Sequence, residues 1–132
     1  MKKIFSLFLI FALILSLTSC GTLNFVDIEE FTSDVYTEDD ITSAMEVVLE
    51  SFRGRTDTVL LRLSYIGDEK LADYQDWADR NNADDVIVFL TDYYISFFSD
   101  NPIMNTGFKY EDYNYILVRS DGGEWEIVDH GY

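Results

Sequence analysis

The stretch VIVFLTDYYI, residues 86–95, decides the fold, because it is the longest apolar run outside the N-terminus and is rich in β-branched and aromatic residues. A run of this length and composition is typical of a strand, and an unbroken apolar start is typical of one buried on both faces. Residues 86–95 therefore predict a central strand in a sheet that is covered on both sides where this strand begins.

Downstream of this strand the chain predicts a hairpin. Residues 113–119 (YNYILVR) favour a strand, residues 120–123 (SDGG) a tight turn, and residues 124–130 (EWEIVDH) a last strand that pairs back. Residues 99–109 contain two turn signals, Asn-Pro and Thr-Gly, and predict a loop before the hairpin.

Upstream, the first predicted helix spans about Glu38 to Arg53. Thr37 is a suitable N-cap, and Asp40 stands where a capping-box acid would return the hydrogen bond. Gly54 follows the last turn as a stop. One face carries an apolar stripe at helical period: Ile41, Ala44, Met45, Val48, Leu49 and Phe52.

Two further elements separate this helix from the central strand. Residues 58–65 (TVLLRLSY) predict a strand, and residues 69–81 predict a second, polar helix with Leu71, Tyr74 and Ala78 on one side. The order helix, strand, helix and three strands indicates an α+β fold.

The expected architecture is a curved, mostly antiparallel sheet of four strands, with the N-terminal helix packed on one face. A roll like that of NTF2-like or cystatin-like domains would fit this order, and a split βαβ layout is the alternative. The domain is expected to span residues 36–132.

The N-terminus has the pattern of a secretory signal. Lys2 and Lys3 precede fourteen residues, 4–17, that are apolar except for two serines. A helix that crosses a bilayer needs roughly 20 apolar residues, so this stretch favours a signal peptide over a stable anchor. Residues 17–20 (LTSC) have the form of a lipobox, which predicts that residues 1–19 are removed. An ordinary signal peptide beside an incidental cysteine is the alternative.

Cys20 is the only cysteine, so it offers a lipidation site and no intramolecular disulfide. Two acyl chains give stable membrane attachment, whereas one chain alone is marginal. Residues 20–35 would then be a lipidated tether. Its apolar side chains, among them Val26, Ile28 and Phe31, are expected to pack against the domain.

The net charge of the mature chain limits the classes of partner that it could bind. Residues 20–132 hold seven basic and 25 acidic residues, a net charge of −18. Nucleic acid binding requires a basic surface, so a nucleic acid partner is excluded. The same charge disfavours contact with anionic lipid headgroups, which leaves the lipid on Cys20 as the expected membrane contact.

Several segments together resemble a family of uncharacterised small lipoproteins from Gram-positive, largely clostridial, bacteria. They are YTEDDITSAMEVV (36–48), LLRLSY (60–65), ADDVIVFLTDY (83–93) and YILVRSDGGEWEIVDHGY (115–132). The resemblance implies a roll-like α+β domain on the outer face of the cell membrane. It implies no activity, so it assigns no catalytic residue. The segment YISFFSDNPIMNTGFK (94–109) departs from the polar loop usual there.

Aromatic side chains gather in the C-terminal half and give the candidate binding patch. Such residues line pockets or exposed patches, although they also pack in cores. Two adjacent phenylalanines near a loop are the most suggestive, since one strand face cannot bury both. The candidates are Tyr93, Phe97, Phe98, Tyr113, Tyr115 and Trp125.

No catalytic or metal-ligating set is recognisable. His130 is the only histidine, and its neighbour Asp129 would point to the opposite face of a strand. One histidine and one lipidated cysteine cannot form a usual zinc site, and the spacing of an EF-hand calcium loop is absent. The expectation is therefore no catalytic residue, no metal and no cofactor.

The sequence thus predicts a membrane-anchored extracytoplasmic lipoprotein with a non-catalytic binding or accessory domain. The sequence does not identify its ligand or protein partner at the cell surface. The alternative is an enzyme of unrecognised type that uses pocket carboxylates and tyrosines.

Overall fold

The computed structural model describes residues 26–97, 99 and 105–132. Cys20, the predicted signal peptide, Phe98 and residues 100–104 of the predicted loop at 99–109 lie outside the described residues. Among the residues that are described, no helix is long and apolar enough to cross a membrane.

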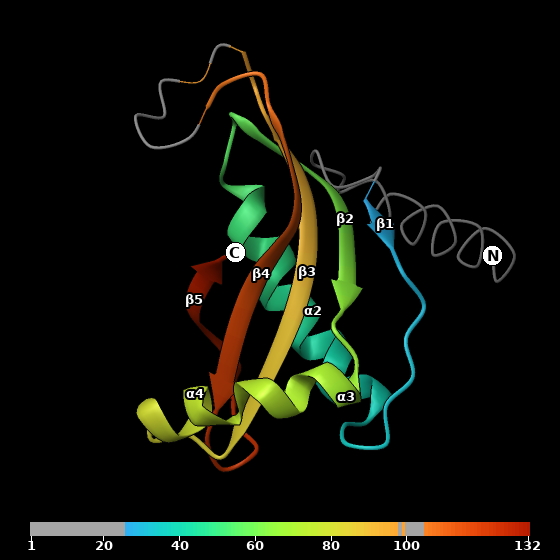
Figure 1. The fold of residues 1–132 in the computed structure, drawn as a ribbon, viewed down its shortest axis with the longest axis vertical. Coiled ribbons are helices and arrows are strands. Elements are labelled where there is room, and N and C mark those ends of the chain that lie inside the picture. Colours follow the sequence, from blue (N-terminus) through green and yellow to red (C-terminus); the bar gives the residue numbers. More distant parts are fainter. Residues whose placement is uncertain (1–25, 98, 100–104) are drawn as a thin grey trace, which may run out of the picture.

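The protein is an α+β fold built on one five-stranded sheet (Figure 1). The strand order is β1 to β5, as in the sequence; β1 pairs with β2 in parallel, and the other pairs are antiparallel. The strands are β1 (Asp27–Ile28), β2 (Thr58–Tyr65), β3 (Asp85–Ile95), β4 (Lys109–Arg119) and β5 (Glu126–Gly131).

The predicted strand number, four, is wrong because the tether supplies the fifth. Asp27 and Ile28 pair with Arg62 and Leu63 at the edge of the sheet. A two-residue strand is too short to show an alternation of apolar and polar residues, so the sequence does not reveal that it pairs with the edge of β2. The expected packing of the tether holds for Val26 and Phe31, which contact the core, whereas Ile28 is 47% exposed.

Helix α2 (Glu38–Arg53) begins and ends as predicted. Thr37 Oγ1 accepts a hydrogen bond from the Asp40 backbone N–H at 3.1 Å, and the Asp40 carboxylate accepts one from the Thr37 backbone N–H at 3.1 Å. This is the capping box. All six residues of the predicted stripe are buried against the sheet.

The predicted second helix is interrupted. It consists of α3 (Asp68–Leu71), a 3₁₀ turn η1 (Ala72–Tyr74) and α4 (Gln75–Arg80). Only Leu71 and Ala78 are buried in these segments, so little tertiary packing favours one regular helix.

The start of β3 is the centre of the core, as predicted. Val86, Ile87, Val88 and Phe89 have no exposed surface, although their side chains alternate between the two faces. Helix α2 lies on one face of the sheet, and the α3–α4 segment crosses the other face near the end where β3 begins (Figure 1).

The predicted hairpin turn is confirmed. Asp121 and Gly122 both have positive φ, at 55° and 65°, and the Gly123 N–H donates to the Ser120 carbonyl at 2.9 Å. These are the features of a type I′ turn, although β4 and β5 pair only from Val118 and Glu126 onward, outside the turn. The strands differ in length from the prediction: β4 begins four residues earlier, at Lys109, and β5 begins two residues later, at Glu126.

Candidate functional site

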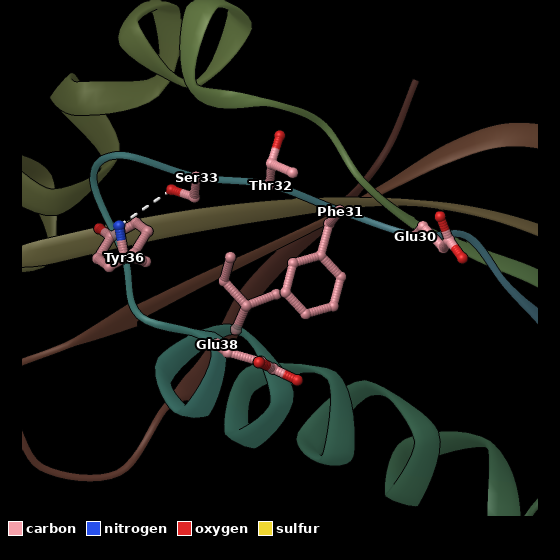
Figure 2. Close-up of a pocket in the computed structure, with 7 residues that line it drawn as sticks. Glu30, Phe31, Thr32, Ser33, Tyr36 and Glu38 are labelled. Carbon is pink, nitrogen blue, oxygen red and sulfur yellow. Dashed lines mark hydrogen bonds between the residues drawn. The ribbon is translucent and has the colours of Figure 1, made fainter.

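The tether and the first turn of α2 enclose a pocket of about 500 Å³ (Figure 2). We call it the tether pocket. The Phe31 ring points from the tether toward α2, while Glu30 and Glu38 come from the two sides, one from the tether and one from the helix. The lining residues are Glu30, Phe31, Thr32, Ser33, Tyr36, Glu38 and Ile41.

One end of the pocket is fixed by Asp68, the first residue of α3. The Asp68 carboxylate accepts hydrogen bonds from Ser33 Oγ at 2.6 Å, from the Asp34 N–H at 2.7 Å and from the Tyr65 hydroxyl at 2.7 Å. Ser33 Oγ in turn accepts from the Tyr36 N–H at 3.0 Å. The Ser33 hydrogen bond is the main cause that lowers the pKa of Asp68, so this carboxylate is charged and holds the turn of the tether.

The other end is fixed by Arg62 on β2. Its guanidinium donates two hydrogen bonds to Asp92, both at 2.9 Å, and further ones to Glu29 at 3.1 Å and to Asp112 at 2.6 Å. Ser64 Oγ donates to Glu29 at 2.7 Å. The Arg62 hydrogen bond lowers the pKa of Asp92, and the pairing raises the pKa of Arg62. Glu29 therefore ties the tether to β2, beside its backbone bond to Leu63.

Helix α2 is fixed beneath the pocket by Arg119 of β4. The Arg119 guanidinium donates to Asp40 at 2.7 Å and to Asp85 at 2.8 Å, and it stacks 4.4 Å from the centre of the Trp125 ring. The Arg119 hydrogen bond is the largest cause that lowers the pKa of Asp40. The capping residue of the helix is thus also an ion-pair partner of the sheet.

The wall of the tether pocket is acidic and aromatic. Within the described part of the chain, Glu30 and Glu38 form no hydrogen bond or ion pair through their side chains. The Tyr36 hydroxyl donates to the Val86 carbonyl at 2.7 Å, and burial, followed by the charge of Asp85, raises the pKa of Tyr36 to about 12. The phenol is therefore neutral at physiological pH, and the free charges at the pocket are carboxylates.

The predicted aromatic patch is divided between different places. Tyr93, Tyr113 and Tyr115 lie together on the sheet face that packs against α2, with the Tyr93 and Tyr113 ring centres 5.3 Å apart and those of Tyr113 and Tyr115 6.1 Å apart. All three are buried, at 1%, 8% and 1% exposure.

The other candidates do not join this cluster. Trp125 is buried beside Tyr36, with ring centres 5.6 Å apart, and Phe97 is 75% exposed after the end of β3. Phe98 lies outside the described residues. A binding surface made by the six residues stays a prediction. The tether pocket was not predicted from the sequence, which indicated only that Phe31 and other apolar side chains of the tether pack against the domain.

His130 does not pair with its neighbouring carboxylate. Its Nδ1 lies 3.1 Å from the Tyr113 hydroxyl, and its ring stacks on Tyr115. The Asp129 carboxylate accepts instead from the backbone N–H of His130, at 2.9 Å.

Among the described carboxylates, those whose pKa is shifted all have a lowered pKa, which is the direction expected of structural ion pairs and caps. They are Glu29, Asp40, Asp57, Asp68 and Asp92.

Among residues 26–97, 99 and 105–132, no group of three or more His, Cys, Asp or Glu side chains is placed to hold a metal ion. Comparison of the chain with protein-family models, with curated proteins and with solved structures finds no match.

Proposed function

We propose that this protein is a membrane-anchored extracytoplasmic lipoprotein whose mature domain binds a small cationic organic ligand in the tether pocket and does not catalyse a reaction. The observation that carries the proposal is the construction of the pocket. The segment that would follow the lipidated Cys20 is part of the sheet and also forms one wall of the pocket.

The lining of the pocket favours a cation. Two carboxylates that have no side-chain partner among the described residues, Glu30 and Glu38, attract positive charge, and the face of Phe31 suits an alkylammonium group. A pocket of about 500 Å³ lies within the range of small-molecule sites. None of the described residues that line it is basic, so the carboxylates of Glu30 and Glu38 would repel an anionic ligand.

The short tether sets the place of the domain. From Cys20 to Asp27 the chain advances seven residues, which span at most about 25 Å when fully extended. The proposal therefore places the pocket close to the outer face of the membrane. Membership in the clostridial lipoprotein family, and a roll of the NTF2-like or cystatin-like kind, belong to this proposal as well.

The ligand test uses the full chain in a nonionic detergent. Choline, putrescine and lysine methyl ester are titrated by calorimetry, each beside an uncharged analogue of similar shape. We expect saturable binding of at least one cation and none of its neutral analogue. If neither any cation nor any analogue binds, or if the two bind equally, the proposed ligand class is wrong.

A matched pair of variants locates the site. Glu38→Gln removes a lining carboxylate, whereas Asp39→Asn removes the same charge from the same turn of α2 outside the pocket. We expect Glu38→Gln to weaken binding roughly fivefold or more and Asp39→Asn by less than about twofold, because a charge acts most strongly on the cation it contacts. Equal effects of the two variants would assign binding to the general negative field of the protein.

A further inference from the structure

A second groove lies far along α2 from the tether pocket. It has a volume of about 590 Å³ and runs between the middle of α2 and the start of β5. We call it the α2–β5 groove. Its lining residues are Glu46, Val47, Glu50, Ser51, Trp125, Glu126 and Ile127.

The α2–β5 groove combines apolar and acidic side chains. Val47, Trp125 and Ile127 supply the apolar part, and all three pack against the core. Glu46, Glu50 and Glu126 supply three carboxylates, of which the first two pair with Arg53. Glu126 has no side-chain partner in the part of the chain that the structure describes, so the net charge of the groove is negative.

Strand β5 offers backbone groups beside this groove. It is an edge strand: β4 is its neighbour on one side, and no described strand lies on the other. At the far end of β5 the Asp129 carboxylate already binds the His130 N–H. At Glu126–Val128, next to the groove, no described side chain binds the backbone in this way. An unprotected sheet edge accepts an added strand.

We propose that the α2–β5 groove binds an extended peptide segment of a partner protein, in which Lys or Arg residues alternate with branched apolar residues. The segment adds to the edge of β5 at Glu126–Val128. Its apolar side chains enter the groove over Val47 and Ile127, and its basic side chains meet Glu126 and the carboxylates of α2.

Two observations favour this occupant over others. The Glu126 carboxylate has no side-chain partner among the described residues, and a Lys or Arg side chain of the peptide would supply one. A second copy of this chain is a poorer partner, because pairing of two β5 edges would bring Glu126 and Asp129 toward the same acids of the other copy.

The test measures the fluorescence anisotropy of a labelled probe with the full chain in a nonionic detergent. The probe is a peptide of about eight residues in which Lys and Arg alternate with Val and Ile. One control peptide carries Glu in place of Lys and Arg. A second keeps every side chain but has N-methylated amides at alternate positions, which removes its ability to pair with a strand edge.

We expect saturable binding of the probe and no binding of the acidic control. Glu126→Lys should weaken binding about tenfold, and N-methylation should weaken it at least as much, because strand addition depends on main-chain hydrogen bonds. Glu124→Lys makes the same charge change at an exposed residue outside the groove and should weaken binding less than about twofold.

Three results would overturn the proposal. They are absence of saturable probe binding, equal binding of the N-methylated peptide, and equal weakening by Glu124→Lys and Glu126→Lys. A concentration-dependent dimer that Glu126→Lys abolishes would also overturn it, since the edge would then belong to a second copy. None of these results bears on cation binding in the tether pocket, so the two proposals fail separately.

Discussion

At the scale of single residues, Arg62 links the tether to two other strands of the sheet. It contacts carboxylates from the tether, β3 and β4 at once, and its strongest partner, Asp92, is 8% exposed. A buried ion pair contributes little by itself when compared with apolar packing, but removal of one partner leaves a buried charge without compensation. Arg62 is therefore needed because Asp92 is there.

Replacement of this residue gives the first prediction. Arg62→Met should lower the free energy of unfolding by about 3 kcal/mol, since the buried Asp92 carboxylate would lose both of its guanidinium hydrogen bonds. It would keep the Asp112 N–H at 3.0 Å and the Lys109 ammonium at 4.0 Å. The backbone N–H of Glu29, which donates to Leu63 at 3.1 Å, should also exchange with solvent faster. Urea unfolding and hydrogen exchange measure the two effects.

Arg80→Met is the control for Arg62→Met. It removes an ion pair with Asp76 in which both side chains are more than half exposed, and such pairs contribute less than about 1 kcal/mol. Equal destabilisation by Arg80→Met and Arg62→Met would contradict this account of the Arg62 network.

Asp68 gives a prediction on pH dependence. Its pKa is below the ordinary value of 3.8, so the unfolded chain binds a proton on this group more readily than the folded protein does. The stability that Asp68 contributes is therefore complete above that ordinary value and is lost as the pH falls through the pKa of the folded state.

The comparison of wild type with Asp68→Asn isolates this effect from the other acids. Wild type should have the greater free energy of unfolding at pH 6, and the difference between the two proteins should narrow by pH 3. Urea titrations at both values measure it. A difference that stays constant or widens on acidification would show that Asp68 is not held as a carboxylate by Ser33 and its neighbours.

At the scale of elements, the sequence predicts best what is decided locally. The bounds of α2 follow from Thr37, Asp40 and the apolar stripe, all of which act within the helix or on its buried face. The turn at Asp121-Gly122 follows from residues that tolerate positive φ. The central place of β3 follows from its continuous apolar start.

Elements and sites that depend on distant contacts were not predicted. The pairing of β1 rests on Glu29 meeting Arg62 and Ser64, 33 and 35 residues away. The tether pocket depends on Ser33 meeting Asp68, also 35 residues away. The spacing of apolar residues along the chain carries no information on contacts between such distant side chains, so neither the pairing of β1 nor the tether pocket could be predicted from the sequence. The location of the aromatic candidates could not be predicted either, because composition alone does not separate the buried Tyr93 from the exposed Phe97.

The cap of α2 gives the prediction at this scale. Thr37→Ala should lower the free energy of unfolding by about 1 kcal/mol, because the Asp40 N–H would lose its acceptor at the end of the helix. Thr42→Ala changes the same side chain at an exposed interior position of α2 and should be neutral or slightly stabilising. Thermal unfolding of both variants tests this prediction. A loss of stability in Thr42→Ala as large as that in Thr37→Ala would contradict the capping role of Thr37.

At the scale of the whole molecule, the tether joins the two parts of the proposal. It is the segment that would carry the lipid, and it is also an edge strand and one wall of a pocket. A domain attached in this way is held near the membrane by a short segment instead of by its charge, which is negative enough to repel anionic headgroups.

The central claim is attachment through Cys20, and the measurement that tests it most directly is membrane fractionation of wild type and Cys20→Ser in a Gram-positive host fed a labelled fatty acid. We predict that wild type is labelled and lies in the membrane fraction. Cys20→Ser should be unlabelled and largely released, with the same unfolding midpoint as wild type, because the sheet and α2 are built from residues that follow Cys20 in the chain. A Cys20→Ser protein that stays in the membrane fraction, or a wild type without label, would contradict the account.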